Sequence, residues 1–142
     1  MAAINMRRVA LGAVAGGVVW VLWSMLINVV LLAHRYTAAQ EAGLLLKAPR
    51  YSFFIGYWIV TLFLASYILA WLYASARATL GAGFGTALKI GLVGGFLAGF
   101  PLNLSTATWA PVDRIFPLWW MLDMWVGAVA ATVIAAWLYK EQ

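Results

Sequence analysis

One carboxylate stands inside an otherwise apolar run, "FPLWWMLDMWVGAVAATVIAAWLYK", which covers residues 116–140. An ionisable side chain at membrane depth is costly unless it is paired or hydrogen-bonded, and such residues often bind protons, ions or substrates. Asp123 is therefore the first candidate for a functional residue.

Three further polar residues stand at a comparable depth in the other apolar runs. Asn28 lies about five residues before the end of the first run, Tyr57 lies a similar distance into the second, and Asn103 closes the third. Amide and hydroxyl groups can donate hydrogen bonds to a carboxylate. The sequence thus predicts one intramembrane polar layer, with one member from each run: Asn28, Tyr57, Asn103 and Asp123.

Three other residues are weaker candidates. Trp58 has the right depth to line the polar layer. Lys89 is expected to extend its ammonium group to the opposite membrane surface. His34, beside Arg35 at the end of a run, is interpreted as an interfacial anchor, with a pigment ligand or a subunit contact as alternatives. One histidine and no cysteine exclude bis-histidine haem and multi-ligand zinc sites within one chain, so we expect no cofactor and no metal.

The composition places all these residues in a membrane protein. Hydrophobic residues make up 66% of the 142 residues and charged residues only 9%, against roughly 25% charged in soluble domains. The net charge of +5 is interpreted as loop charge that orients the helices and contacts anionic headgroups. We therefore expect a lipid bilayer around the chain and no nucleic-acid partner.

A spanning helix needs about 20 mostly apolar residues, and four runs meet this length. They predict an all-α, integral membrane four-helix bundle of up-and-down topology, with both termini on one side and a single domain. Arg7 and Arg8, which adjoin the first run, favour a cytoplasmic N-terminus. The expected spans are about 9–33, 53–76, 84–104 and 117–139.

The first loop and the helix faces carry further signals. Within "TAAQEAGLLLK", Thr37 and Gln40 have capping-box spacing, which predicts a short interfacial helix. Every run also carries small residues four apart, and such rows let membrane helices approach closely. The rows are Gly12 and Gly16; Ser66, Ala70 and Ala74; Gly91, Gly95 and Gly99; and Gly127, Ala131 and Ala135.

A short internal similarity suggests two tandem helical hairpins. "AWLY" at 70–73 recurs at 136–139, and the first and third runs share "GAVAGG" against "GLVGGF". Under this duplication Tyr57 occupies the position that Asp123 holds in the second hairpin. Chance is the alternative, because Trp and Tyr gather at both membrane faces in any case.

The segment "AWLYASARATLGAGFGTALKIGL", together with the C-terminal "AAWLYK", resembles a family of small uncharacterised bacterial four-helix membrane proteins. In that family a Trp-Leu-Tyr-Ala helix end, an Arg and a Gly-x-Gly turn lead into the next span. The resemblance implies four spans and a bacterial source, and it implies no activity.

Three interpretations of the polar layer remain open: hydrogen bonding that fixes helix register, a small pocket or proton-accessible site, and contact with a partner chain. We expect a non-enzymatic accessory or structural membrane protein in a homo-oligomer or a larger membrane complex. The alternative is a small oligomeric transporter or channel whose path uses the Asp123 layer. A multi-pass protein of the bacterial inner membrane is expected in either case.

Overall fold

The structure, a computed structural model, describes residues 3–141, and every regular element in that range is a helix. Four helical stretches are long and apolar enough to cross a membrane: Met6–Leu31, Phe54–Leu80, Phe84–Trp109 and Ile115–Leu138. The predicted four-helix membrane bundle is confirmed. The elements in chain order are α1 (Met6–Met25), the π-helix η1 (Leu26–Leu31), α2 (Ala33–Glu41), α3 (Phe54–Leu80), α4 (Phe84–Trp109) and α5 (Ile115–Leu138).

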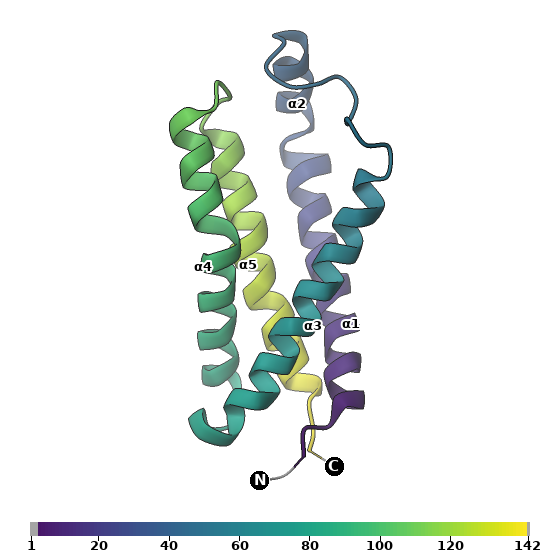
Figure 1. Cartoon of the computed structure of the whole chain (residues 1–142), viewed down its shortest axis with the longest axis vertical. Helices are drawn as coiled ribbons and strands as arrows, with labels where there is room; N and C mark the ends of the chain where they lie inside the picture. Colours follow the sequence, from purple (N-terminus) through teal and green to yellow (C-terminus); the bar gives the residue numbers. More distant parts are fainter. Residues whose placement is uncertain (1–2, 142) are drawn as a thin grey trace.

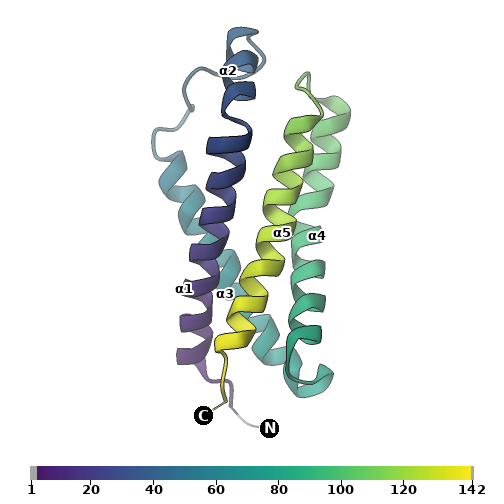
Figure 2. The ribbon, with the colours of Figure 1, turned by 180° about the vertical axis from the view of Figure 1, so that it is seen from behind.

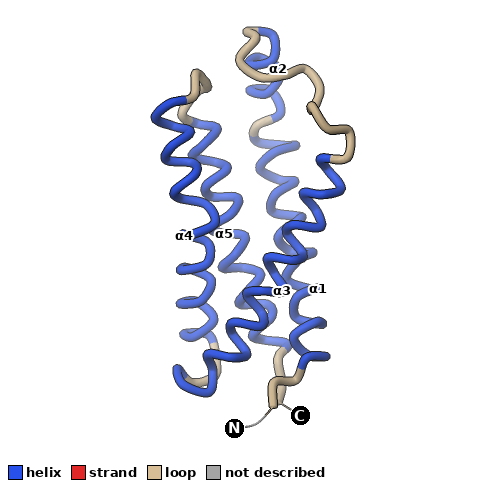
Figure 3. Tube along the Cα trace, viewed as in Figure 1, coloured by secondary structure: helices blue, strands red, loops and turns tan. Residues whose placement is uncertain are grey.

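The four long helices run alternately up and down, and both termini lie at one end of the bundle (Figure 1). We call this the terminal end, and we call the opposite end, where α2 lies, the α2 end. The backbone N–H of Asn5 donates to Tyr139 Oη at 3.1 Å, so the beginning of α1 and the end of α5 are joined directly. Loops are confined to the two ends, as the tube drawing shows (Figure 3).

Helix α5 is the centre of the packing. It contacts α1, α3 and α4, whereas α1 and α4 do not contact each other. Helices α3 and α4 are joined by the glycine-rich turn at the terminal end and diverge toward the α2 end (Figures 1 and 2). A polar group buried in the middle of the bundle must therefore find its hydrogen-bond partners largely along the faces of α5.

The predicted small-residue rows lie where helices meet. A Cβ atom added to Gly91 would come within 2.7 Å of Val129 Cα, and one added to Gly95 within 2.9 Å of Trp125 Cα. A Cβ on Gly99 would lie 2.9 Å from a backbone oxygen of α5. Since lipid tails are as apolar as leucine, such backbone contact, rather than hydrophobic burial, holds α4 on α5.

Close backbone contact at small residues also brings α1 onto α5 and α3. Gly12 faces Ala135, where an added Cβ would lie 2.9 Å from Cα, and a Cβ added to Gly16 would lie 2.7 Å from the backbone oxygen of Ala131. Ser66 of α3 donates a hydrogen bond of 2.9 Å to a backbone carbonyl of α1. The three helices thus share a close-packed seam in the half of the bundle nearer the terminal end.

The first span does not end in a loop as expected. It continues through η1 and a bend at Leu32 into α2, and Leu32 N–H donates to Ile27 O, five residues back, at 2.9 Å. This i→i−5 bond is the mark of a π-turn. The capping-box prediction for Thr37 is wrong, because α2 begins earlier, at Ala33, and Thr37 Oγ1 donates to the Ala33 carbonyl.

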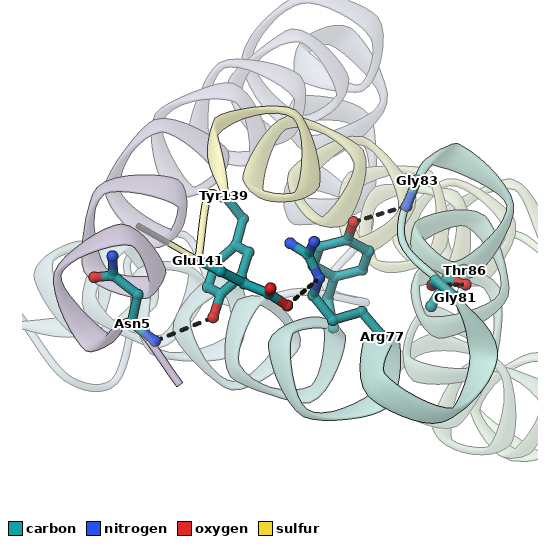
Figure 4. Close-up of polar contacts among 8 residues, drawn as sticks. Asn5, Arg77, Gly81, Gly83, Thr86, Tyr139 and Glu141 are labelled. Carbon is teal, nitrogen blue, oxygen red and sulfur yellow. Dashed lines mark hydrogen bonds and ion pairs between the residues drawn. The ribbon is translucent and has the colours of Figure 1, made fainter. Parts of the chain in front are cut away.

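The terminal end is closed by a polar and aromatic cluster (Figure 4). Arg77 Nε lies 3.2 Å from Glu141 Oε1, and the Arg77 guanidinium sits 4.9 Å from the centre of the Tyr139 ring. Tyr73 meets Tyr139 edge to face and accepts a hydrogen bond from the Gly83 N–H at 3.0 Å. The two "AWLY" segments therefore end in tyrosines that contact each other, and Tyr73 also contacts the α3–α4 turn.

Replacing Gly91 by alanine should destabilise the bundle by about 1–3 kcal/mol, because the new methyl group would meet the backbone of α5. Gly85, in the first turn of the same helix, faces open space. Gly85→Ala should therefore be neutral or stabilising by up to about 1 kcal/mol through the better helix propensity of alanine. Thermal unfolding of both variants in one detergent compares them; equal shifts would contradict the packing role of the row.

Candidate functional site

Asp123 lies on the third turn of α5 with its side chain 1% exposed. Its Oδ2 atom accepts two hydrogen bonds, from Ser24 Oγ at 2.8 Å and from Asn28 Nδ2 at 2.9 Å. Ser24 belongs to α1 and Asn28 to η1, so the carboxyl group joins α5 to the end of the first span.

Asp123 belongs to a hydrogen-bond network with two branches. The first branch reaches Asp123 from the α2 end. Trp120 Nε1 donates to Tyr36 Oη at 2.7 Å, and Tyr36 Oη donates to Asn28 Oδ1 at 2.7 Å. An indole N–H can only donate. The Tyr36 hydroxyl hydrogen is therefore left for Asn28, and this fixes the Asn28 amide with its NH₂ group toward Asp123.

A second branch comes from α3. Trp58 Nε1 donates to Ser24 Oγ at 3.2 Å. Because this indole also can only donate, the Ser24 hydroxyl hydrogen points to Asp123 Oδ2. Both branches begin at a tryptophan and end on the same carboxyl oxygen. Oδ2 is thus an acceptor in both bonds.

The other carboxyl oxygen has no partner. Within residues 3–141, Asp123 Oδ1 is the only buried side-chain nitrogen or oxygen that lacks a hydrogen bond. The carboxyl group is consequently asymmetric, with one oxygen bonded twice and one oxygen bare.

Two tryptophans of α1 hold the backbone on which Asp123 stands. Trp20 Nε1 donates to the Asp123 carbonyl at 3.1 Å, and Trp23 Nε1 donates to the Leu122 carbonyl at 3.2 Å. The Trp20 indole fits beside α5 because Gly127, one turn further on, has no side chain there. The position of the carboxyl group is therefore set by backbone bonds as well as by side-chain bonds.

The π-turn bears directly on the site. Asn28 lies within η1, and its amide also donates to the Ser24 carbonyl at 2.9 Å. Both amide hydrogens are thus used, one on the helix backbone and one on Asp123. Single π-turns inside α-helices frequently accompany functional sites, and here the turn lies next to the only buried acid of residues 3–141.

Tyr36 lies on α2, outside the spanning stretches. Burial raises the pKa of its phenol above the ordinary value, the Trp120 hydrogen bond acts in the opposite direction, and the Coulomb field of an ionised Asp123 would add to the rise. Tyr36 therefore stays a neutral phenol at physiological pH and keeps the hydrogen that it donates to Asn28.

The structure brings together only part of the layer expected from the sequence. Asn28, Asp123 and the weaker candidate Trp58 lie in one network. Tyr57 does not belong to it, since it is 67% exposed and its ring lies against Phe53 on the outer face of α3. Successive helix residues are about 100° apart, so Trp58 takes the inward direction and Tyr57 turns toward lipid.

The other candidates also lie apart from the carboxyl group. Asn103 is buried, but its Nδ2 donates to the Gly99 carbonyl of its own helix at 2.7 Å. Lys89 on α4 and His34 on α2 are exposed. None of the three has a hydrogen bond or ion pair with Asp123 among the contacts within residues 3–141.

Three members of the network were not expected from the sequence: Ser24, Tyr36 and Trp120. The sequence spacing could have placed Ser24 in the network, because it stands four residues before Asn28 and so shares its helix face. Tyr36 had no such signal, since its position depends on the first span continuing through a π-turn into α2. Trp120 carries only the general signal that tryptophan gathers at membrane faces, which does not point to this network.

Among residues 3–141, no group of three or more His, Asp or Glu side chains is placed to hold a metal ion. No protein-family model, curated protein or solved structure matches the chain. The function is therefore inferred from the geometry of this site and from the bundle that surrounds it.

Tyr36→Phe should destabilise the protein by about 1–3 kcal/mol, because it leaves the Trp120 N–H and the Asn28 carbonyl oxygen without partners. The matched control is Tyr57→Phe, which removes a hydroxyl from an exposed ring and should change stability by no more than about 0.5 kcal/mol. Thermal unfolding in the same detergent measures both. A Tyr36→Phe effect no larger than that of the control would contradict the network.

Proposed function

We propose that this integral membrane protein is a non-enzymatic accessory or structural subunit of a homo-oligomer or larger membrane complex, with Asp123 fixing the register of its helices. The observation that carries this proposal is that both donors to Asp123 come from the protein's own chain, on a side chain 1% exposed. The hydrogen bonds of the carboxyl group are thus made within the protein's own bundle.

The connectivity of the network supports a register-fixing role. Its side-chain bonds link α5 to α1, η1 and α2, and α3 enters through Trp58. Hydrogen bonds between membrane helices are individually modest, but each of these requires a particular rotation and depth of its helix. Together they select one arrangement out of the many that close packing alone would permit.

The direction of the hydrogen bonds favours this role over the alternative, a small transporter or channel. Each branch starts at an indole, which donates its hydrogen but cannot accept one. A chain of this kind holds its hydrogens in a single orientation and does not pass protons inward from the α2 end. A transport path would need acceptors at that end of the network.

Partners would then engage the outer faces of the bundle. These faces carry large exposed apolar side chains, such as Val14, Leu97 and Leu102, which contact lipid tails or the helices of a neighbouring subunit. Together with Arg7 and Arg8 in the first turn of the first span, the resemblance to small bacterial membrane proteins supports a place in the bacterial inner membrane with a cytoplasmic N-terminus.

The register-fixing role predicts different outcomes for two substitutions. Asp123→Asn should retain most of the stability, because an amide oxygen can still accept from Ser24 and Asn28. Asp123→Leu should cost about 1–2 kcal/mol for each donor that it leaves without a partner. Thermal unfolding of the three forms in detergent at one pH tests this, and equal stability of all three would defeat the register-fixing role.

The subunit role predicts association in lipid. Native mass spectrometry of the protein released from lipid nanodiscs, after gentle extraction from its own membrane, should show more than one copy or a co-purifying membrane chain. Asp123→Asn should leave this association intact, since Asp123 bonds only within its own chain. A single copy without any partner would contradict the subunit role, whatever the outcome of the stability test.

A further inference from the structure

The bare Oδ1 atom of Asp123 is the one buried polar side-chain atom without a partner in residues 3–141. It lies in a helix bundle whose outer surface faces lipid, where water cannot replace a missing hydrogen bond. A native structure rarely leaves such an atom without a physical reason.

Within residues 3–141, no cation is paired with this carboxyl group. The side chains that reach it or its two donors are neutral: Ser24, Asn28, Tyr36 and Trp58. The two ion pairs found within residues 3–141 are Arg35–Asp113 and Arg77–Glu141, which lie in the two end regions.

The other titratable groups on the packed helices face elsewhere. On α1, Arg7 and Arg8 stand at the terminal end, and on α3, Tyr57 points outward and Arg77 pairs with Glu141. On α4, Lys89 is exposed near the terminal end. Tyr36, held neutral by burial, is thus the one titratable group that the network connects to Asp123.

An ionised carboxylate would place half of its charge on Oδ1 with neither a donor nor a cation beside it. Leaving a buried charge uncompensated is far more costly than leaving a neutral hydroxyl without an acceptor. A metal ion requires several ligands, and within residues 3–141 no group of three or more His, Asp or Glu side chains is placed to hold one. A proton needs only the one oxygen.

We propose that Asp123 is a proton-binding site, and that in the folded protein it is a neutral carboxylic acid with its proton on Oδ1. The reaction is the addition of one proton from solvent to the carboxylate, with no other reactant. The position of the proton follows from the two branches. Because their indoles fix Ser24 and Asn28 as donors to Oδ2, Oδ2 is the carbonyl oxygen and Oδ1 is the hydroxyl.

This inference goes beyond the register-fixing role and can fail separately from it. A carboxylate could also hold Ser24 and Asn28 in place, so loss of the proton site would leave the structural role standing. A protonated and an ionised Asp123 differ in how the free energy of unfolding responds to pH. If folding retains a proton that the unfolded chain releases, the free energy of unfolding falls as pH rises, and Asp123→Asn should abolish that part of the dependence.

Infrared spectroscopy of the full chain in lipid nanodiscs at neutral pH tests the proposal directly. The chain has only four acidic residues, and the other three, Glu41, Asp113 and Glu141, are exposed. We expect one C=O stretching band of a protonated carboxyl group, absent in Asp123→Asn and retained in the matched control Asp113→Asn. A folded wild-type protein without this band, or a band that survives Asp123→Asn, would overturn the proposal.

A second variant tests which oxygen holds the proton and does not require the Asn variant to fold. Ser24→Ala removes one of the two donors to Oδ2, so the band should persist and move to higher frequency as its carbonyl loses a hydrogen bond. An unchanged frequency would show that the carbonyl oxygen is Oδ1 and would overturn the assignment. Circular dichroism of each variant checks that the helices are retained.

Discussion

The carboxyl group of Asp123 must find its partners inside the bundle, because the surrounding hydrocarbon offers none. Much of the α2 half of the molecule is arranged around this constraint. The first span widens into a π-turn at Asn28, its continuation places Tyr36 over the end of α5, and α3 turns Trp58 rather than Tyr57 inward. Each of these features supplies or orients a donor.

The helix backbones are brought together by other means. Glycine and alanine rows bring α1 against α5 in the terminal half and α4 against α5 along the bundle as far as Met121, and the space beside Gly127 admits the Trp20 indole between α1 and α5. This packing brings the backbones into contact, while in the proposed role the Asp123 network selects the register.

The spans and the bundle could be predicted because length and apolarity decide whether a helix can cross a bilayer. The association of Asn28 with Asp123 could be anticipated from depth alone, and the hydrogen bond is present. Depth says nothing about direction around a helix, which is why Tyr57 and Asn103 were grouped with Asp123 although one faces lipid and the other bonds to its own helix. The position of Tyr36 depends on a π-turn that no residue type in the first span indicates.

The hydrogen-bond directions give the site a property that no single residue has. Two indoles, which can only donate, set the orientation of a phenol, an amide and a hydroxyl, and so make Oδ2 the acceptor of both branches. Had either indole been replaced by an imidazole, its branch could run in both directions and the carboxyl group could exchange hydrogens with the α2 end. With tryptophan at both positions the network cannot exchange hydrogens in this way. The one protonation state that the network leaves open is that of Oδ1. A group held in this way is suited to keeping one structure.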